Sequence, residues 1–171
     1  MGYGVTPGLF TAFAPSLHTN SFGGNASLQG YYVSNPQIVP AAVVNIANTA
    51  QEVAPGNGIT FLDPGQIFLH PGGLSFTSAD TDPINNAILR FTAPTAGAYS
   101  ITGDWETLHF GTTSKQILVN GVSVFSDSAS TPSFNLTANL KVNDHVDFLV
   151  NPDGVIAGDS VGPSSFRVEL D

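Results

Sequence analysis

Cysteine is absent from the 171 residues of this chain, and charged side chains make up only 10% of it. Without cysteine the chain forms neither disulfide bonds nor a cysteine-ligated zinc site, and it has no thiol chemistry. This absence fixes no compartment, because exported and cytosolic proteins can both lack disulfides. A chain of this length can build a core unaided, so we predict a single domain over residues 1–171.

Basic residues are the scarcest charged class. Four lysines and arginines stand against 13 aspartates and glutamates, which gives a net charge of -9. Nucleic-acid binding needs a cluster of cations that displaces counterions from phosphates, and anionic membrane surfaces attract similar clusters. Apolar runs are also short, since none approaches the roughly 20 residues of a transmembrane helix. The sequence therefore predicts no nucleic-acid partner and no membrane insertion.

The surface composition is polar but uncharged, with many glycines, serines, threonines and asparagines. Such a composition is typical of exported bacterial β proteins. The opening "GYGVTPG" lacks both the basic and the apolar segment of a signal peptide. Either the protein is cytosolic, or its signal has been removed or replaced by Met1. The composition favours the second alternative, so we expect a protein of the extracellular space or the cell surface.

Helical periodicity is almost missing as well. Only "PAAVVNIANTAQEVA", residues 40–54, combines a proline suited to a first helical turn with several alanines. The same segment contains "AVVNI", a short β-type run, and its asparagines and threonine are poor helix formers. Helix and strand both stay open for this segment.

What the sequence has instead is apolar and polar residues alternating between turn signals, which is the pattern of β-strands. Turns are predicted at "DPG", "TAG" and "KVND", and Asn120-Gly121 is a strong hairpin signal. In "AYSITGDW", Tyr99, Ile101 and Trp105 share one face. Strands with one apolar face need a second sheet to cover them. We therefore predict an all-β fold, a two-sheet antiparallel β-sandwich and jelly roll of about eight to ten strands with little helix.

Residues 1–51 contain no charged side chain and many aromatic ones. One interpretation is an irregular segment that wraps the sandwich and plugs it with aromatic rings. The other is a contact surface for identical subunits or a polymer, because few charges and many aromatics mark interface cores. Self-association through residues 1–51 is thus one hypothesis. The aromatic residues concerned are Tyr3, Phe10, Phe13, Phe22, Tyr31 and Tyr32.

Four segments, "IFLHPGG", "ILRFTAPTAGAYSITGDW", "ILVNGVSVFSD" and "VNDHVDFLVNPDG", carry a resemblance over about residues 61–150. In this order they resemble the jelly-roll domain of exported bacterial proteins that carry a PEP-CTERM sorting tail. The resemblance implies a surface or matrix component similar to carbohydrate-binding modules. Because its motifs are turn and core residues, it indicates fold rather than activity. The turn "APTAGAY", residues 93–99, also resembles, more weakly, the turn before a core strand in trimeric C1q- and TNF-like jelly rolls.

Two carboxylates, Asp104 and Glu106, lie two residues apart on one predicted strand face. Their separation along the strand, about 6.6–7 Å, falls within the range that inverting glycosidases use. Solvent-facing strand positions also carry carboxylates commonly, and this second interpretation is favoured. No nucleophile elbow, zinc-binding helix motif, dinucleotide loop or Walker loop is present. We therefore predict that the chain is not an enzyme.

Glycan binding needs exposed aromatic rings that stack on sugars and polar groups that fix hydroxyls. Tyr31, Tyr32 and Trp105 are the candidate rings, and Asp104 and Glu106 are the candidate polar groups. The parity of Trp105 with its apolar neighbours favours a core position for that ring.

Two loops offer oxygen ligands to a Ca²⁺ ion, which takes six to eight of them. "SADTDPINN" contributes Asp80, Asp82 and Asn85, and "NPDGVIAGD" contributes Asp153 and Asp159. Asp-Pro and Asp-Gly are also ordinary turn residues, which is the favoured interpretation, so no cofactor is certain.

Two further polar residues lie within apolar strands. Arg90 either faces solvent or pairs with a carboxylate, and solvent exposure is favoured. His70 ends a strand, where we expect it to be buried and hydrogen-bonded to a turn.

The sequence thus favours a non-catalytic extracellular or surface β-sandwich for adhesion or for glycan or matrix binding. Two alternatives stay open: a self-assembling structural subunit of an extracellular fibre or layer, and a trimeric receptor-binding jelly roll.

Overall fold

The computed structural model describes residues 1–4, 10–12, 14, 18–19, 25–32, 41–53, 61–71, 86–107, 113–129, 131–151 and 161–170, of which 3–4, 18–19, 32, 161–167 and 170 by backbone alone. Within these ranges the chain forms strands and turns and no helix, hence no helix able to cross a membrane. The strands are β1 Gly2–Gly4, β2 Thr11–Ala12, β3 His18–Thr19, β4 Leu28–Tyr32, β5 Ala41–Asn45, β6 Gln51–Glu52, β7 Phe61–Leu62, β8 Ile67–His70, β9 Asn86–Thr92, β10 Gly97–Thr107, β11 Ser114–Val119, β12 Val122–Asp127, β13 Ser133–Leu140, β14 His145–Asn151 and β15 Val161–Leu170.

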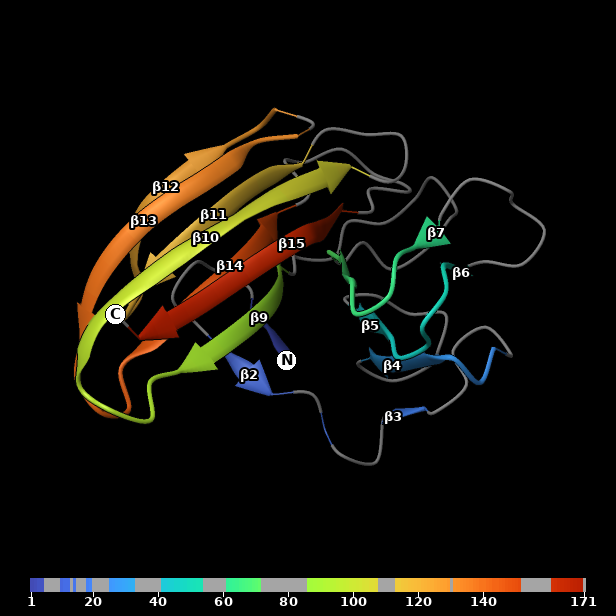
Figure 1. Ribbon diagram of the computed structural model, residues 1–171, viewed down its shortest axis with the longest axis horizontal. Coiled ribbons are helices and arrows are strands. Elements are labelled where there is room, and N and C mark those ends of the chain that lie inside the picture. The colour runs from blue at the N-terminus through green and yellow to red at the C-terminus, as the bar shows by residue number, and fades with distance from the viewer. Residues whose placement is uncertain are drawn as a thin grey trace.

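Two antiparallel sheets make up the body of the protein. Sheet A has the order β12-β11-β14-β9-β1-β2, and sheet B has the order β13-β10-β15-β8-β5-β4-β3. In Figure 1 the long strands β10 and β15 of sheet B lie in front of β11 and β14 of sheet A. The chain changes sheet at nearly every step from β8 to β15, which is the interleaved order of an eight-stranded jelly roll. The predicted all-β sandwich and jelly roll are confirmed.

The described parts of residues 1–51 extend both sheets. β1 and β2 add to sheet A beside β9, while β3, β4 and β5 add to sheet B beside β8. These short strands raise the strand number above the eight to ten expected. The open question at residues 40–54 is also answered, because Ala41–Asn45 form a strand rather than a helix. β-Branched Val43 and Val44 suit that strand, whose centre is buried.

The main core lies between the two sheets and contains the predicted inward residues. Tyr99, Ile101 and Trp105 of β10 are buried, and the Trp105 ring lies 6.4 Å from that of Phe134 and 6.5 Å from that of Phe148. Phe134 and Phe148 belong to opposite sheets. Trp105 therefore helps to join the two layers at the centre of the sandwich.

The predicted turns form as expected. Asn120 and Gly121 have φ angles of 50° and 80°, the left-handed pair that a two-residue hairpin between β11 and β12 requires. At "DPG", the Gln66 amide donates to the Asp63 carbonyl at 3.0 Å and closes the turn. Residues "KVND" join β13 to β14, where the Asp144 amide donates to the Lys141 carbonyl at 3.0 Å.

Each sheet also carries a small apolar cluster on its outer side. On sheet B, Leu28, Val43 and Phe68 pack with Val53 and Leu62, which come from the β6–β7 region. On sheet A, Ile88, Leu118 and Leu149 pack beneath Phe10. Early segments of the chain thus cover part of the outer face of each sheet.

Candidate functional site

The two predicted carboxylates lie on the outer side of sheet B. Asp104 and Glu106 are exposed on β10, and Trp105 between them is buried, so the predicted sharing of one face is confirmed. The pairing of β10 with β15 shifts register between Asp104 and Trp105 without changing this alternation. Both carboxylates therefore project from one open strand surface.

The neighbouring strand β13 continues this surface with uncharged polar side chains. Its outward residues Ser133, Asn135, Thr137 and Asn139 are all exposed. Opposite them on β10 stand Asp104, Thr102, Ser100 and Ala98 in that order. We call this surface the polar face, and define it by Ser100, Thr102, Asp104, Glu106, Ser133, Asn135, Thr137 and Asn139. It is two strands wide and presents hydroxyl, amide and carboxylate groups.

The predicted aromatic platform does not assemble beside the polar face. Trp105 is fully buried in the core, so its ring has no exposed side on which a sugar could stack, and its role as a ligand-binding residue is corrected. Tyr31 is half-buried and packs against the main core. Tyr31 and the backbone of Tyr32 lie on β4. Three strands, β15, β8 and β5, separate β4 from β10 in sheet B. The Tyr32 side chain lies outside the described residues.

The predicted calcium ligands Asp80, Asp82, Asn85, Asp153 and Asp159 also lie outside the described residues. Among the residues that the structure does describe, no group of three or more His, Asp or Glu side chains could hold a metal ion. The calcium site therefore stays a prediction.

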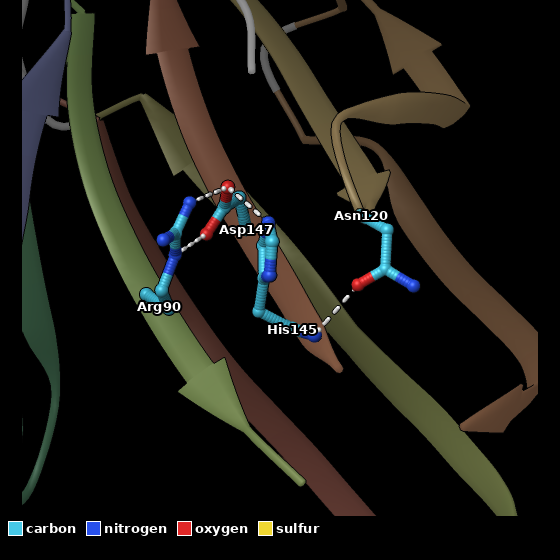
Figure 2. Close-up of polar contacts among 4 residues, drawn as sticks. All are labelled: Arg90, Asn120, His145 and Asp147. Atoms are coloured by element: carbon cyan, nitrogen blue, oxygen red, sulfur yellow. Dashed lines mark hydrogen bonds and ion pairs between the residues drawn. The ribbon is translucent and has the colours of Figure 1, made fainter. Parts of the chain in front are cut away.

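A second polar arrangement lies on the outer side of sheet A, where Figure 2 shows Arg90, Asp147, His145 and Asn120 next to one another. Arg90 Nε donates to Asp147 Oδ1 at 2.6 Å, and Arg90 Nη2 donates to Asp147 Oδ2 at 2.7 Å. His145 Nε2 lies 3.9 Å from Asp147 Oδ2. The prediction that Arg90 faces solvent is wrong: Asp147 is directly opposite on β14, and the two-pronged guanidinium matches its carboxylate.

This ion pair is largely shielded from water. The Asp147 side chain is 2% exposed and that of Arg90 is 21% exposed. The guanidinium carbon of Arg90 lies 3.9 Å above the centre of the Phe10 ring, a cation–π contact. Phe10 in turn covers Ile88, Leu118 and Leu149. Arg90 is thus held by a carboxylate on one side and an aromatic ring on another.

Gly2 explains how Phe10 reaches this position. A Cβ atom at Gly2 would clash with the Thr11 carbonyl oxygen and the Phe10 ring, so only glycine permits β1 to lie against this segment. The Met1 amino group lies nearby, and burial, followed by the positive charge of Arg90, lowers its pKa. The N-terminal strands are therefore fitted closely to the outer side of sheet A.

Asn120 and His145 connect this arrangement to a turn. Asn120 Oδ1 accepts a hydrogen bond from the His145 amide at 2.9 Å, and the Asn120 amide donates to the His145 carbonyl at 2.9 Å. Both carboxylate oxygens of Asp147 are already engaged by Arg90. We therefore assign the group on sheet A to holding β9, β11 and β14 together, and we place the candidate binding surface on the polar face.

Two further polar residues, Lys115 and His70, lie outside both polar arrangements, and only His70 was the subject of a sequence prediction. Lys115 received no prediction, yet it is 1% exposed, and its Nζ donates to the Ala129 carbonyl at 2.7 Å and to Thr107 Oγ1 at 3.3 Å. Its parity with Ile117 on β11 was the signal that could have revealed it. His70 is half-buried with Nδ1 2.7 Å from the Pro71 carbonyl oxygen, close to what we expected.

No protein-family model matches the chain, and no curated protein matches it in sequence. Among solved structures, a family 35 carbohydrate-binding module from Clostridium thermocellum shares 15% identity, covers 62% of this chain and 92% of that one, and has a TM-score of 0.35. The mannan-binding module from Man5C shares 20% identity over 50% of this chain and 74% of that one, with a TM-score of 0.33. The enzymatically active domain of tailspike protein 4 from bacteriophage CBA120 shares 12% identity over 98% of this chain and 23% of that one, with a TM-score of 0.39. The jelly-roll assignment rests on the strand order itself.

Proposed function

We propose that this chain is a non-catalytic module of the extracellular space or cell surface, and that it binds neutral polysaccharide through the polar face. The single observation that carries the proposal is the row of exposed Ser133, Asn135, Thr137 and Asn139 along β13, beside the outward residues of β10. Adhesion to a glycan-containing matrix would follow from such binding.

The chemistry of these side chains matches that of sugar hydroxyls. A hydroxyl group donates one hydrogen bond and accepts others, and so do serine and threonine, while asparagine offers two donors and an acceptor. Outward residues repeat about every 6.6–7 Å along a strand, and neighbouring strands lie about 4.7–4.9 Å apart. The polar face is therefore a regular grid of donors and acceptors, suited to an extended polymer rather than a small ligand.

Charge selects the class of polymer. The chain has a net charge of -9, and the polar face itself carries Asp104 and Glu106. A uronic-acid or sulfated polymer would be repelled by this field, whereas a neutral polymer would not. Neutral polysaccharides are therefore the proposed ligands.

The openness of the surface favours binding over hydrolysis. Glycosidases place two carboxyl groups on either side of the scissile bond. Asp104 and Glu106 project from the same strand face and are both exposed, so a polymer lying on β10 would meet them from one side only. We therefore propose that they bind sugar hydroxyls.

The extracellular position is supported by composition and resemblance. The chain is poor in charge and rich in uncharged polar residues, and residues 61–150 resemble the jelly-roll domain of exported PEP-CTERM proteins. Detection of the natural protein in the culture medium or on intact cells, rather than in the cytosolic fraction, tests this part of the proposal.

Affinity electrophoresis in gels that contain neutral glucan, xylan, mannan or galactan tests the binding. We expect at least one polymer to retard the protein. The double substitution Glu106→Ala with Asn135→Ala should weaken that binding at least tenfold. The matched control is Ser126→Ala, an exposed position on β12 of the other sheet, which should bind as the unmodified protein does. Failure of all four polymers to retard the protein, or equal loss in the control, would contradict the proposal.

A further inference from the structure

Strand β13 forms one edge of sheet B. Its eight residues pair with β10 from Ser133 opposite Asp104 to Leu140 opposite Gly97, without a break in register. Within the described ranges, no strand pairs with the other side of β13. The sheet therefore ends at a strand whose pairing register is regular.

The direction of the free backbone groups follows from one hydrogen bond. The Trp105 amide donates to the Pro132 carbonyl at 2.9 Å, so residue 132 directs its carbonyl toward β10. In an antiparallel ladder, alternate residues direct both backbone groups to the same side. Asn135, Thr137 and Asn139 therefore direct their N–H and C=O groups away from β10, toward the open edge.

Within its described residues, this edge lacks several of the features by which proteins protect exposed strands. Charged residues, proline and bulges commonly prevent one edge strand from pairing with another. The sequence of β13, "SFNLTANL", contains no charge, proline or glycine. By contrast β12, the edge strand of sheet A on the same side, has a register shift opposite Ile117 and Leu118 that leaves Val124 as an extra residue. Only β12 of these two edges carries such a bulge.

We propose that β13 is a docking edge for a second copy of this chain. The two β13 strands pair antiparallel across a twofold axis, with Thr137 opposite the partner's Thr137 and Asn135 opposite the partner's Asn139. Each of these residues directs its backbone groups outward, so each pair exchanges two hydrogen bonds. The seven-stranded sheet B then continues into the same sheet of the second copy.

Charge and burial explain why the occupant is a second copy. Two chains with a net charge of -9 repel each other, but no like charges meet in this register because β13 is uncharged. At its end the partner's Lys141 faces Ser133, beside the exposed Asp104 of β10, which brings opposite charges together. The half-buried Leu136 and Ala138 point to the inner side, where a paired strand would cover them. This inference does not rest on the proposed polysaccharide binding.

Cysteine cross-linking tests the register, because the chain has no cysteine of its own. In a hydrogen-bonded antiparallel pair the Cα atoms lie about 5.5 Å apart, within the range of a disulfide bond. Thr137→Cys should therefore form a disulfide-linked dimer under mild oxidation. Asn135→Cys, whose two copies would lie about 13 Å apart along the strands, should not. Equal cross-linking of both variants would indicate random collision and overturn the register.

Sedimentation equilibrium tests the dimer. We expect the unmodified chain to show a monomer–dimer equilibrium at protein concentrations up to about 1 mM, which detects even weak association. Thr137→Lys places two like charges across the axis and should raise the dissociation constant at least tenfold. Ser100→Lys, on the adjacent strand β10, makes the same change of charge away from the edge and should leave it within about twofold. A monomer at all concentrations, or equal effects of the two lysines, would overturn the proposal.

Unfolding curves of each variant distinguish loss of the dimer from misfolding of the monomer. The Thr137 amide does not bond to β10 in the assigned alternation, so edge substitutions there should leave the monomer folded. Near-ultraviolet circular dichroism of Trp105 reports on the core of each variant. Polysaccharide binding and dimerisation are separate measurements, so either proposal can fail without the other.

Discussion

The outer faces of the two sheets differ in what their outward residues do. On sheet A these residues are Ile88 and Arg90 on β9 and Asp147 and Leu149 on β14, and Phe10 lies over them. On sheet B the outward positions of β10 and β13 carry mainly serine, threonine and asparagine together with the carboxylates Asp104 and Glu106, and those of β13 are exposed. The strand alternation is the same in both sheets. The side chains at outward positions decide which face is covered by the chain and which stays open to a ligand.

The covered face is held by an ion pair as well as by apolar contact. The Asp147 carboxylate of this bidentate pair is 2% exposed, so folding removes it from water. The pair contributes to stability only while both partners are present, because either one alone would be a largely buried charge without a partner. On the polar face the outward side chains of β13 are exposed, so they can contact other molecules. Substitutions on the two faces should therefore affect different properties: stability on sheet A, and binding on sheet B.

Asp147→Ala should have the largest effect on stability. It leaves the Arg90 guanidinium without its carboxylate in a mostly buried place, which costs about 3–5 kcal/mol of unfolding free energy. Urea denaturation followed by the fluorescence of Trp105 measures the change. The double variant Arg90→Met with Asp147→Leu should recover most of the loss, because two apolar side chains can replace a buried pair. If the single variant were as stable as the unmodified chain, the ion pair would not hold sheet A.

Phe10→Ala should have the next largest effect, about 1–2 kcal/mol. The substitution exposes part of the cluster of Ile88, Leu118 and Leu149 and removes the cation–π contact with Arg90. Phe10→Leu keeps apolar cover and loses only the aromatic contact, so it should cost about 0.5–1 kcal/mol. Thermal and urea unfolding of the two variants separate these contributions. Equal stability of all three chains would show that the N-terminal segment does not secure this face.

The fold was predictable because local signals agreed with one another. The alternation in "AYSITGDW" placed Tyr99, Ile101 and Trp105 in the core correctly, and Asn120-Gly121 predicted the β11–β12 hairpin. These signals act over a few residues. The fold class follows from them because it depends only on which face of each strand is apolar and on the order of strands and turns. The strands of the N-terminal segment were harder to predict, because they are short and take their pairing from β8 and β9.

The environment of Arg90 could not be predicted from its strand alone. Its carboxylate, Asp147, is 57 residues away in sequence, and which residue faces it depends on the register of β9 against β14. Trp105 shows the opposite case, since its parity already indicated a core position. Pairing across strands thus escapes local sequence patterns, whereas the direction of a side chain within one strand does not.

A smaller effect is expected at Asp144, in the turn that joins β13 of the open face to β14 of the covered one. Its carboxylate accepts a hydrogen bond from the Lys141 amide at 2.8 Å, and this bond is the main cause that lowers its pKa below the usual 3.8. A lowered carboxyl pKa contributes stability above the unfolded value, and this contribution is lost as pH falls through the folded value. Asp144→Asn should therefore reduce the difference in unfolding free energy between neutral pH and a pH below the pKa that this carboxyl has in the folded chain. Urea denaturation across this range measures it, and an unchanged pH dependence would contradict the role of the turn.

Asn139→Ala should have the smallest effect and is the sharpest test of the contrast between the faces. Asn139 is exposed at the edge of the open face and lies opposite Ala98, so its truncation should change the unfolding free energy by no more than about 0.5 kcal/mol. Leu149→Ala on the covered face is the matched truncation of a side chain that is 0% exposed, and it should cost about 2–5 kcal/mol. Urea denaturation of both variants in dilute solution, below any self-association, makes the comparison. A loss at Asn139 as large as that at Leu149 would mean that the polar face is structural, and its serine, threonine and asparagine side chains could then no longer be assigned to a ligand.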